Sequence, residues 1–305
     1  MATGGRHDVD TTMDASPRLR RLLADLPTRP LRRVVWDRVK HWRRVAVVET
    51  AFGARMHCDT RDFIQRFVYF FGVWEPNLTA WLPRRLGAGD TFVDVGANVG
   101  YFTLLGAHAV GPAGRVIAVE AAPDTRAALD RNVGLNDLRN VRSIGAAASS
   151  ARGTLVLVPD GEHNVGGTAT VALDAARAGG VQVPAAPLRE LLEPDELARA
   201  RVIKIDVEGA EADVLAGRDL AAGGVREDLE LVVEIAPDRL AERGSSADAL
   251  LQQLRPLGFH TYALANDYRS RSYLHRWPVQ RPVRFHGPLR EQGDVVFSRV
   301  DAELL

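Results

Sequence analysis

The residues best suited to chemistry are acids at or near the ends of short β-branched stretches. Asp94, Glu120 and Asp206 each stand at such a position, and Glu208 follows Asp206 by two residues. Ligands of open α/β sheets bind outside the carboxyl ends of the strands. We therefore expect these carboxylates to meet at one edge of a sheet, beside a bound ligand.

The stretch around Asp94 predicts the unit that forms this edge. Residues 91–95 are apolar and β-branched apart from the acid and indicate a buried strand. Gly96, Asn98 and Gly100 then interrupt it, and the apolar residues 101–110 can form a helix. A strand, a glycine turn and a helix in this order bring backbone and helix N-terminus close to a ligand.

The charge of Asp94 indicates which ligand this turn binds. The turn reads Gly-x-Asn-x-Gly, so it lacks the Gly-x-Gly-x-x-Gly spacing of a dinucleotide site. A carboxylate here repels a pyrophosphate and attracts an ammonium or a sulfonium. S-adenosylmethionine carries both cations and no phosphate, so the stretch favours a methyl-donor site. The alternative is a plain turn, in which Asp-x-Gly is also common.

Two further features fit an adenosine. Glu120 lies 20 residues beyond Gly100, where an acid can accept both ribose hydroxyls. The predicted strand 141–148 ends in three alanines, whose small side chains leave room for a flat base. The alternative is that these alanines have no specific role, because runs of alanine are common in proteins.

Alternating strands and helices from residue 91 onward predict an α/β fold with a parallel sheet covered on both faces. Residues 153–200 depart from this alternation. Two strands, 153–158 and 168–173, flank a polar loop that carries His163, and residues 179–187 predict an irregular connection. Such a loop commonly binds substrate.

The N-terminal third predicts an extension before the sheet. Residues 1–15 are expected to be disordered, residues 16–85 to form a helical and hairpin extension, and residues 86–305 to form the main domain. Residues 18–44 hold ten basic residues against two acids, which fits a solvated helix pair, a membrane-surface helix or a recruiter of acidic substrate. The aromatic residues of 63–81 fit a core, with the break at Glu75 indicating a lid or pocket wall.

Composition narrows the class of protein. The 305-residue chain has a formal net charge of zero, which gives no general support to nucleic-acid binding. Cys58 is the only cysteine, so an internal disulfide is excluded. No apolar run reaches the length of a membrane span, and we expect a cytoplasmic protein. Only Lys40 and Lys204 among 39 basic residues are lysine, which suggests a GC-rich bacterial genome.

Two motifs together resemble the FkbM-type family of S-adenosylmethionine-dependent methyltransferases. They are Asp-Val-Gly-Ala-Asn-Val-Gly-Tyr-Phe-Thr at 94–103 and Lys-Ile-Asp-Val-Glu-Gly-Ala-Glu at 204–211. The resemblance implies the class I, Rossmann-like fold, a mostly parallel seven-stranded sheet with helices on both faces. It also implies methyl transfer to a hydroxyl of a small molecule such as a sugar, a glycoside or a polyketide-like secondary metabolite.

The same resemblance implies the site. The cofactor-binding residues carried across by position are Asp94, Gly96, Ala97, Asn98, Gly100, Tyr101, Glu120, Ala121, Ala147 and Asp206. Within this set, the resemblance implies that Asp94, Gly96, Asn98 and Tyr101 line the methionine portion and that Glu120 holds the ribose. The two alanines at 121 and 147 would flank the adenine, and Asp206 would lie by the sulfonium.

An alcohol acceptor must lose a proton, so a base is needed. The candidates are Asp206, Glu208 and His163, and a divalent metal held by the first two and Glu234 is the alternative activator. We predict no resident metal, and the oligomeric state stays open, with a homo-oligomer possible. Rival functions are N-methylation of a small molecule, a nicotinamide-dependent oxidoreductase and a donor-binding protein without catalysis.

Overall fold

The structure is a computed structural model that describes residues 29–159, 168–171, 180–216, 224–266, 268–269, 272–273 and 279–305. The helices are α2 (Arg29–Val39), α3 (Phe63–Phe71), α4 (Pro76–Arg85), α5 (Tyr101–Val110), α6 (Pro123–Leu135), α7 (Leu188–Leu191), α8 (Pro194–Ala198), α9 (Glu211–Ala216), α10 (Pro237–Glu242) and α11 (Ala247–Leu254), followed by the 3-10 turn η2 (Arg255–Leu257). The strands are β1 (Val45–Glu49), β2 (Arg55–Asp59), β3 (Thr91–Val95), β4 (Arg115–Val119), β5 (Val141–Ile144), β6 (Ala147–Ala148), β7 (Gly153–Pro159), β8 (Thr168–Val171), β9 (Val181–Ala186), β10 (Ala200–Ile205), β11 (Glu230–Ile235), β12 (His260–Leu264), β13 (Val283–Arg284) and β14 (Gly293–Ser298).

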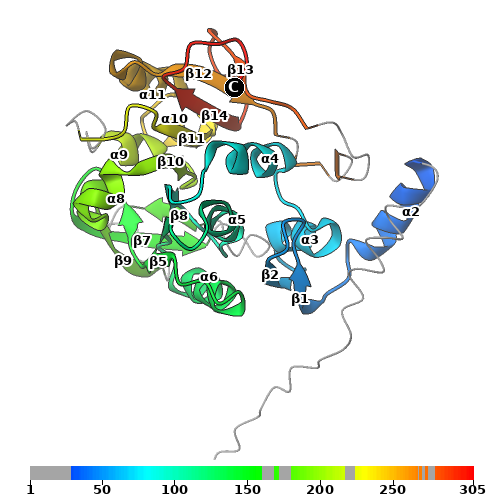
Figure 1. Ribbon diagram of the computed structural model, residues 1–305. Helices are drawn as coiled ribbons and strands as arrows, with labels where there is room; N and C mark the ends of the chain where they lie inside the picture. Colours follow the sequence, from blue (N-terminus) through cyan, green and yellow to red (C-terminus); the bar gives the residue numbers. More distant parts are fainter. Residues whose placement is uncertain are drawn as a thin grey trace, which may run out of the picture.

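The central sheet confirms the predicted α/β class. Its eight strands run in the order β13-β12-β14-β11-β10-β3-β4-β5, and β11, β10, β3, β4 and β5 pair in parallel (Figure 1). The last long strand, β14, runs antiparallel between β11 and β12. Seven of the strands form the predicted sheet, and the two-residue strand β13 adds an edge that the sequence did not predict.

The strands are apolar on both sides because helices cover both faces of the sheet. In β3, Phe92 packs into a core shared with α5 and the N-terminal extension, while Val93 and Val95 pack into a second core on the opposite face. That second core takes in apolar residues of α9, α10 and α11. A strand buried on both faces reads as a continuous apolar run, as this one does.

A second sheet replaces the irregular connection predicted for residues 179–187. Its order is β6-β9-β7-β8, and β9 pairs antiparallel with β7. The prolines there had indicated a break. Pro184 is tolerated because β6 pairs only with Ala185 and Ala186, so that within the described part of the chain one side of β9 has no partner strand at the proline.

The N-terminal extension is built into the main core. Its hairpin β1–β2 turns at Gly53, as predicted, with a φ of 87°. Asp62 caps α3 by accepting a hydrogen bond from the Gln65 backbone N–H at 2.8 Å. Phe67 and Phe70 of α3 pack edge-on and tilted against neighbouring aromatic rings in the core. The prediction that the aromatic segment is core is thus confirmed, while the predicted apolar stripe at residues 19–26 lies outside the described residues.

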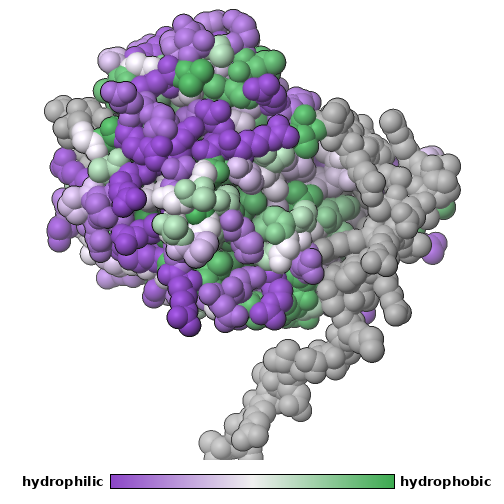
Figure 2. Space-filling model, viewed as in Figure 1, coloured by the Kyte–Doolittle hydropathy of each residue, from purple (hydrophilic) through white to green (hydrophobic). Residues whose placement is uncertain are grey.

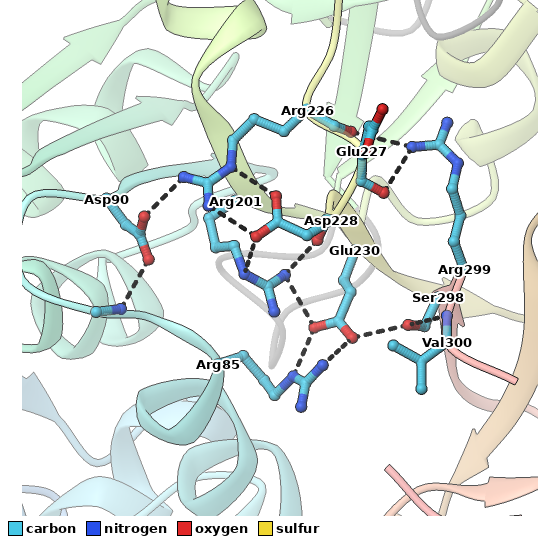
Figure 3. Close-up of polar contacts among 11 residues, drawn as sticks. Arg85, Asp90, Arg201, Arg226, Glu227, Asp228, Glu230, Ser298, Arg299 and Val300 are labelled. Carbon is cyan, nitrogen blue, oxygen red and sulfur yellow. Dashed lines mark hydrogen bonds and ion pairs between the residues drawn. The ribbon is translucent and has the colours of Figure 1, made fainter. Parts of the chain in front are cut away.

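A network of ion pairs lies at the amino-terminal ends of β10 and β11 (Figure 3). Glu230 is buried and accepts from the Arg85 Nε at 2.7 Å, from Arg201 at 3.1 Å and from the Ser298 hydroxyl at 2.9 Å. Arg226 joins Asp90 and Asp228 to the same network. The network ties α4 and strands β10, β11 and β14 together at the sheet edge opposite the acids of the predicted site.

The surface is mainly polar where it can be seen. On the face shown in Figure 2, hydrophobic residues lie in small patches separated by hydrophilic ones. Within the described ranges, no helix has the length and apolar character needed to cross a membrane.

Candidate functional site

The turn after β3 brings two strands unusually close. Gly96 has a φ of 78°, and a Cβ there would lie 1.7 Å from the carbonyl oxygen of Asp206. Only glycine fits at such an approach. Asn98 also adopts the left-handed conformation, with a φ of 51°, which asparagine tolerates better than most residues. The sequence Gly-x-Asn is therefore set by the shape of this turn.

Glu120 closes the other side of the turn. Its carboxylate is buried and accepts hydrogen bonds from the backbone N–H groups of Asn98 at 2.8 Å and Ala122 at 2.9 Å. Burial raises the pKa of Glu120 to about 7, although these two hydrogen bonds act in the opposite direction. The acid is held rigidly at the end of β4, as the predicted ribose-binding role requires.

Asp94 lies near the end of β3 and forms a hydrogen bond with the following helix. It is buried, one carboxylate oxygen accepts from the Thr103 hydroxyl at 2.6 Å, and the other has no hydrogen-bond partner among the described residues. Burial raises its pKa, with Lys204 and Thr103 lowering it. Asp94 is not among the residues that line the cavity described below, and its contact with a donor stays a prediction.

Asp206 and Lys204 form an ion pair at the end of β10. The Lys204 Nζ lies 2.8 Å from the Asp206 Oδ2, and the ammonium also sits over the Phe102 ring. Burial alone would raise the pKa of Asp206, but the charge of Lys204 and hydrogen bonds with Glu234 and Lys204 lower it. Burial alone would lower the pKa of Lys204, and the surrounding carboxylates raise it instead. Asp206 therefore carries a negative charge in this cavity.

Three further carboxyl groups surround this pair, and the sequence reasoning did not combine them. Glu75 and Asp294 are buried and Glu234 is half-buried, and desolvation together with the neighbouring carboxyl groups raises the pKa of each well above its ordinary value. Glu234 accepts from the Tyr268 hydroxyl at 2.7 Å and from the Gln292 amide at 2.9 Å.

The sequence features that could place these three carboxyl groups at the site differ from one group to the next. Glu234 was predicted to lie near this edge, because it is near the end of β11. Asp294 could have been placed here too, because the amino end of the antiparallel strand β14 lies at the same edge as the carboxyl ends of its parallel neighbours. Glu75 comes from the extension, and no local pattern places it there.

These elements enclose one cavity of about 480 Å³ at the carboxyl ends of the strands. It contains seven of the predicted site residues, namely Gly96, Asn98, Glu120, Ala121, Ala147, Asp206 and Glu208. Its remaining wall includes Phe63, Ile64, Trp74, Glu75, Glu234, Arg239, Arg243, Tyr268 and Gln292. Ala97, Gly100 and Tyr101 pack behind the turn, and His163 lies outside the described residues.

Glu208 stands at the rim of this cavity in an ion pair with Arg239. Its φ of 55° is left-handed, and the following Gly209 continues the tight turn into α9. Among the residues that the structure describes, no group of three or more His, Cys, Asp or Glu is arranged to hold a metal ion. The metal alternative with Asp206, Glu208 and Glu234 gains no support from this geometry.

Comparison with known proteins agrees with the site. Residues 94–261 match the methyltransferase FkbM domain. Methyltransferase sdnD of Sordaria araneosa is 32% identical over 169 residues, which cover 44% of this chain and 62% of that protein. Methyltransferase 1 of Beauveria bassiana is 32% identical over 148 residues, which cover 43% of this chain and 59% of that protein. The chain thus matches about three fifths of the length of each relative.

Solved structures are more distant. The SAM-dependent O-methyltransferase TM0748 of Thermotoga maritima is 12% identical and has a TM-score of 0.42, covering 84% of this chain and 78% of that one. The assignment of this chain to a protein family therefore rests on the match of residues 94–261 to the FkbM domain.

The α/β fold with its cavity at the carboxyl ends of the strands, together with that match, defines an S-adenosylmethionine-type methyltransferase. The chain belongs to the FkbM methyltransferase family, as the two motifs predicted. S-adenosylmethionine is its cofactor.

Proposed function

We propose that the protein methylates a hydroxyl group of a small molecule, such as a sugar, a glycoside or a polyketide-like secondary metabolite. One observation carries this proposal. A single cavity joins Glu120 and its alanine-lined surroundings to a chamber with aromatic walls and carboxyl groups. Donor and acceptor can therefore meet inside one enclosed space.

The residues of the cavity fit the cofactor. Gly96 lets the backbone approach a ligand without a side chain, and the buried carboxylate of Glu120 can accept from ribose hydroxyls. The alanines at 121 and 146–148 leave a flat apolar space for adenine. The negative Asp206 faces the same cavity and suits a positively charged sulfur. When bound, S-adenosylmethionine supplies a methyl group on that sulfur.

The acceptor side fits a polyhydroxylated molecule. Trp74 and Phe63 offer apolar ring faces, and Glu234 and Gln292 offer hydrogen-bond acceptors in the same wall. Pockets of this kind combine an apolar surface with a few placed polar groups that fix orientation. Holding a hydroxyl oxygen in line with the methyl group supplies much of the acceleration in such a transfer.

Asp206, Glu208 and His163 are the proton acceptors predicted from the sequence, and the ion pairs of Asp206 and Glu208 weaken the case for these two. Each of these two already forms an ion pair, with Lys204 and Arg239 respectively, which favours its charged form. The low pKa of Asp206 makes it a weaker base than an unpaired carboxylate.

An amine acceptor is the second candidate. The excess of carboxyl groups over Lys204 in the chamber would attract a protonated amine. The test compares matched acceptors, for example methyl glucoside with methyl glucosaminide, in a panel of glycosides and phenolic polyketides. We expect S-adenosylhomocysteine release and an O-methyl product by mass spectrometry. An N-methyl product alone, or no product from any acceptor while the cofactor binds, would contradict O-methylation.

A further inference from the structure

Part of the cavity wall comes from outside the part of the chain that matches the family. The match spans residues 94–261. The wall residues Phe63, Ile64, Trp74 and Glu75 precede it, and Tyr268 and Gln292 follow it. These segments supply part of the proposed acceptor side, and Glu75 is the ionisable group that the N-terminal extension contributes to the cavity wall.

Glu75 is held in an unusual way. It is only 4% exposed, it lines the cavity, and its Oε2 has no hydrogen-bond partner among the described residues. Its backbone has a φ of 42°, which is a costly conformation for glutamate, immediately before Pro76 begins α4. Its backbone N–H donates to the Tyr273 hydroxyl at 3.0 Å, which fixes this conformation.

A buried carboxylate oxygen without a partner costs free energy, and no structural partner explains this one. Asp94 and Glu211 also have one unpartnered oxygen each, but neither residue lines the cavity, and two acids that do line it are fully engaged. Both oxygens of Glu120 accept backbone N–H groups, and Asp206 pairs with Lys204. Glu75 thus lines the cavity with a buried carboxyl group, one oxygen of which has no partner among the described residues.

We infer that Glu75 is the catalytic residue that removes the proton from the acceptor hydroxyl. The inference rests on the proposed function. The acceptor oxygen forms its bond to the methyl carbon while the carbon–sulfur bond breaks and its electron pair stays on sulfur. The oxygen–hydrogen bond also breaks, its electron pair stays on the acceptor oxygen, and the Glu75 carboxylate takes the proton. The products are the methyl ether, S-adenosylhomocysteine and one proton, which passes to solvent as the products leave.

The surroundings of Glu75 adjust its proton affinity to this task. Burial, Asp294 and Asp206 raise the pKa of Glu75, whereas Lys204 and the hydroxyl of Tyr268 lower it. Glu234, which contacts Tyr268, is a further acid in the chamber. A positive sulfur bound beside this cluster would favour the ionised form of Glu75, so the base becomes active when the donor is present.

The first test needs no acceptor. Calorimetry in buffers of different ionisation enthalpy counts the protons released when S-adenosylmethionine or S-adenosylhomocysteine binds. Both carry the ribose that meets Glu120, so the difference between them reports the charge on sulfur. We expect the wild type to release more protons with S-adenosylmethionine, by on the order of half a proton near the Glu75 pKa.

Glu75→Gln should remove most of this difference while S-adenosylhomocysteine affinity stays within about threefold. The matched control is Asp62→Asn, which alters another buried acid of the extension whose pKa burial also raises and which lies outside the cavity wall. Asparagine keeps the cap of α3, so this variant should keep the full difference. A full difference in Glu75→Gln, or its loss in Glu234→Gln alone, would overturn the inference.

The second test uses an acceptor found in the panel above. Glu75→Gln should lower kcat by about 100-fold or more with little change in donor affinity, as expected for loss of a general base. It should also remove the acid limb of the kcat profile, and an unchanged kcat would refute the inference. If the wild type binds neither S-adenosylmethionine nor S-adenosylhomocysteine, the proposed function itself fails, and that result is distinct from a failure of Glu75.

Discussion

Glu120 gives a quantitative prediction about stability. Its pKa rises from 4.5 to about 7 on folding, because burial disfavours the carboxylate more than its two backbone hydrogen bonds favour it. One pKa unit corresponds to about 1.4 kcal/mol, so the shift corresponds to about 3 kcal/mol. The folded protein binds more protons than the unfolded chain between these two values. This contribution to stability is therefore fully present below pH 4.5 and is lost as the pH rises to about 7.

The perturbation is Glu120→Gln, which removes the titrating group. Glutamine keeps one acceptor oxygen and loses the second, so the variant carries a constant penalty for one unpaired backbone N–H. The pH dependence is the informative quantity. We expect the difference in the free energy of unfolding, wild type minus Glu120→Gln, to fall by about 3 kcal/mol across this window.

Urea unfolding of both proteins, followed by tryptophan fluorescence at several pH values between 4.5 and 8, measures this difference without a ligand. Other acids that titrate in the same range cancel, because both proteins contain them. A difference that stays constant within about 0.5 kcal/mol would refute the argument that Glu120 is protonated at mildly acidic pH. Adding S-adenosylhomocysteine should shift the transition of the wild type toward lower pH, because ribose hydroxyls stabilise the ionised carboxylate.

Three further predictions follow from the geometry. Gly96→Ala should abolish binding of S-adenosylhomocysteine in calorimetry and destabilise the protein, since the new Cβ would lie 1.7 Å from the Asp206 carbonyl oxygen; near-normal affinity would contradict this. Glu230→Gln should lower the free energy of unfolding by about 3 kcal/mol in urea, because it breaks a buried ion pair, yet leave donor affinity unchanged since the network lies at the opposite edge of the sheet. A stability loss below about 0.5 kcal/mol would contradict the role of that network. Methyl transfer should be insensitive to a chelator such as EDTA, and a loss of activity that magnesium restores would reverse this prediction.

The sequence alone predicted those parts of the site that lie within a single strand–turn–helix unit. The strand, turn and helix from Thr91 to Val110 were predictable, because apolar periodicity and glycine spacing act over a few residues. Glu120 was predictable for the same reason, as its distance from Gly100 sets its place in the next unit.

Contacts between distant segments were not predictable in this way. Glu75 and Tyr268 lie 193 positions apart and reach one cavity only through tertiary packing. Strand β9 was not predicted, because a proline such as Pro184 usually indicates a break in a strand. The structure shows that the short strand β6 pairs only with the residues after this proline. Asp94 was expected at the ligand because its charge suits a sulfonium, and its hydrogen bond with Thr103 of the following helix could not be read from the sequence.

The central claim is that the cavity at the carboxyl ends of β3, β4 and β10 binds S-adenosylmethionine. Calorimetric titration of the purified protein with S-adenosylhomocysteine and, separately, with NAD tests it most directly. We predict saturable one-to-one binding of S-adenosylhomocysteine, lost in Gly96→Ala, and no binding of NAD. Tight binding of NAD with no response to S-adenosylhomocysteine would contradict the account.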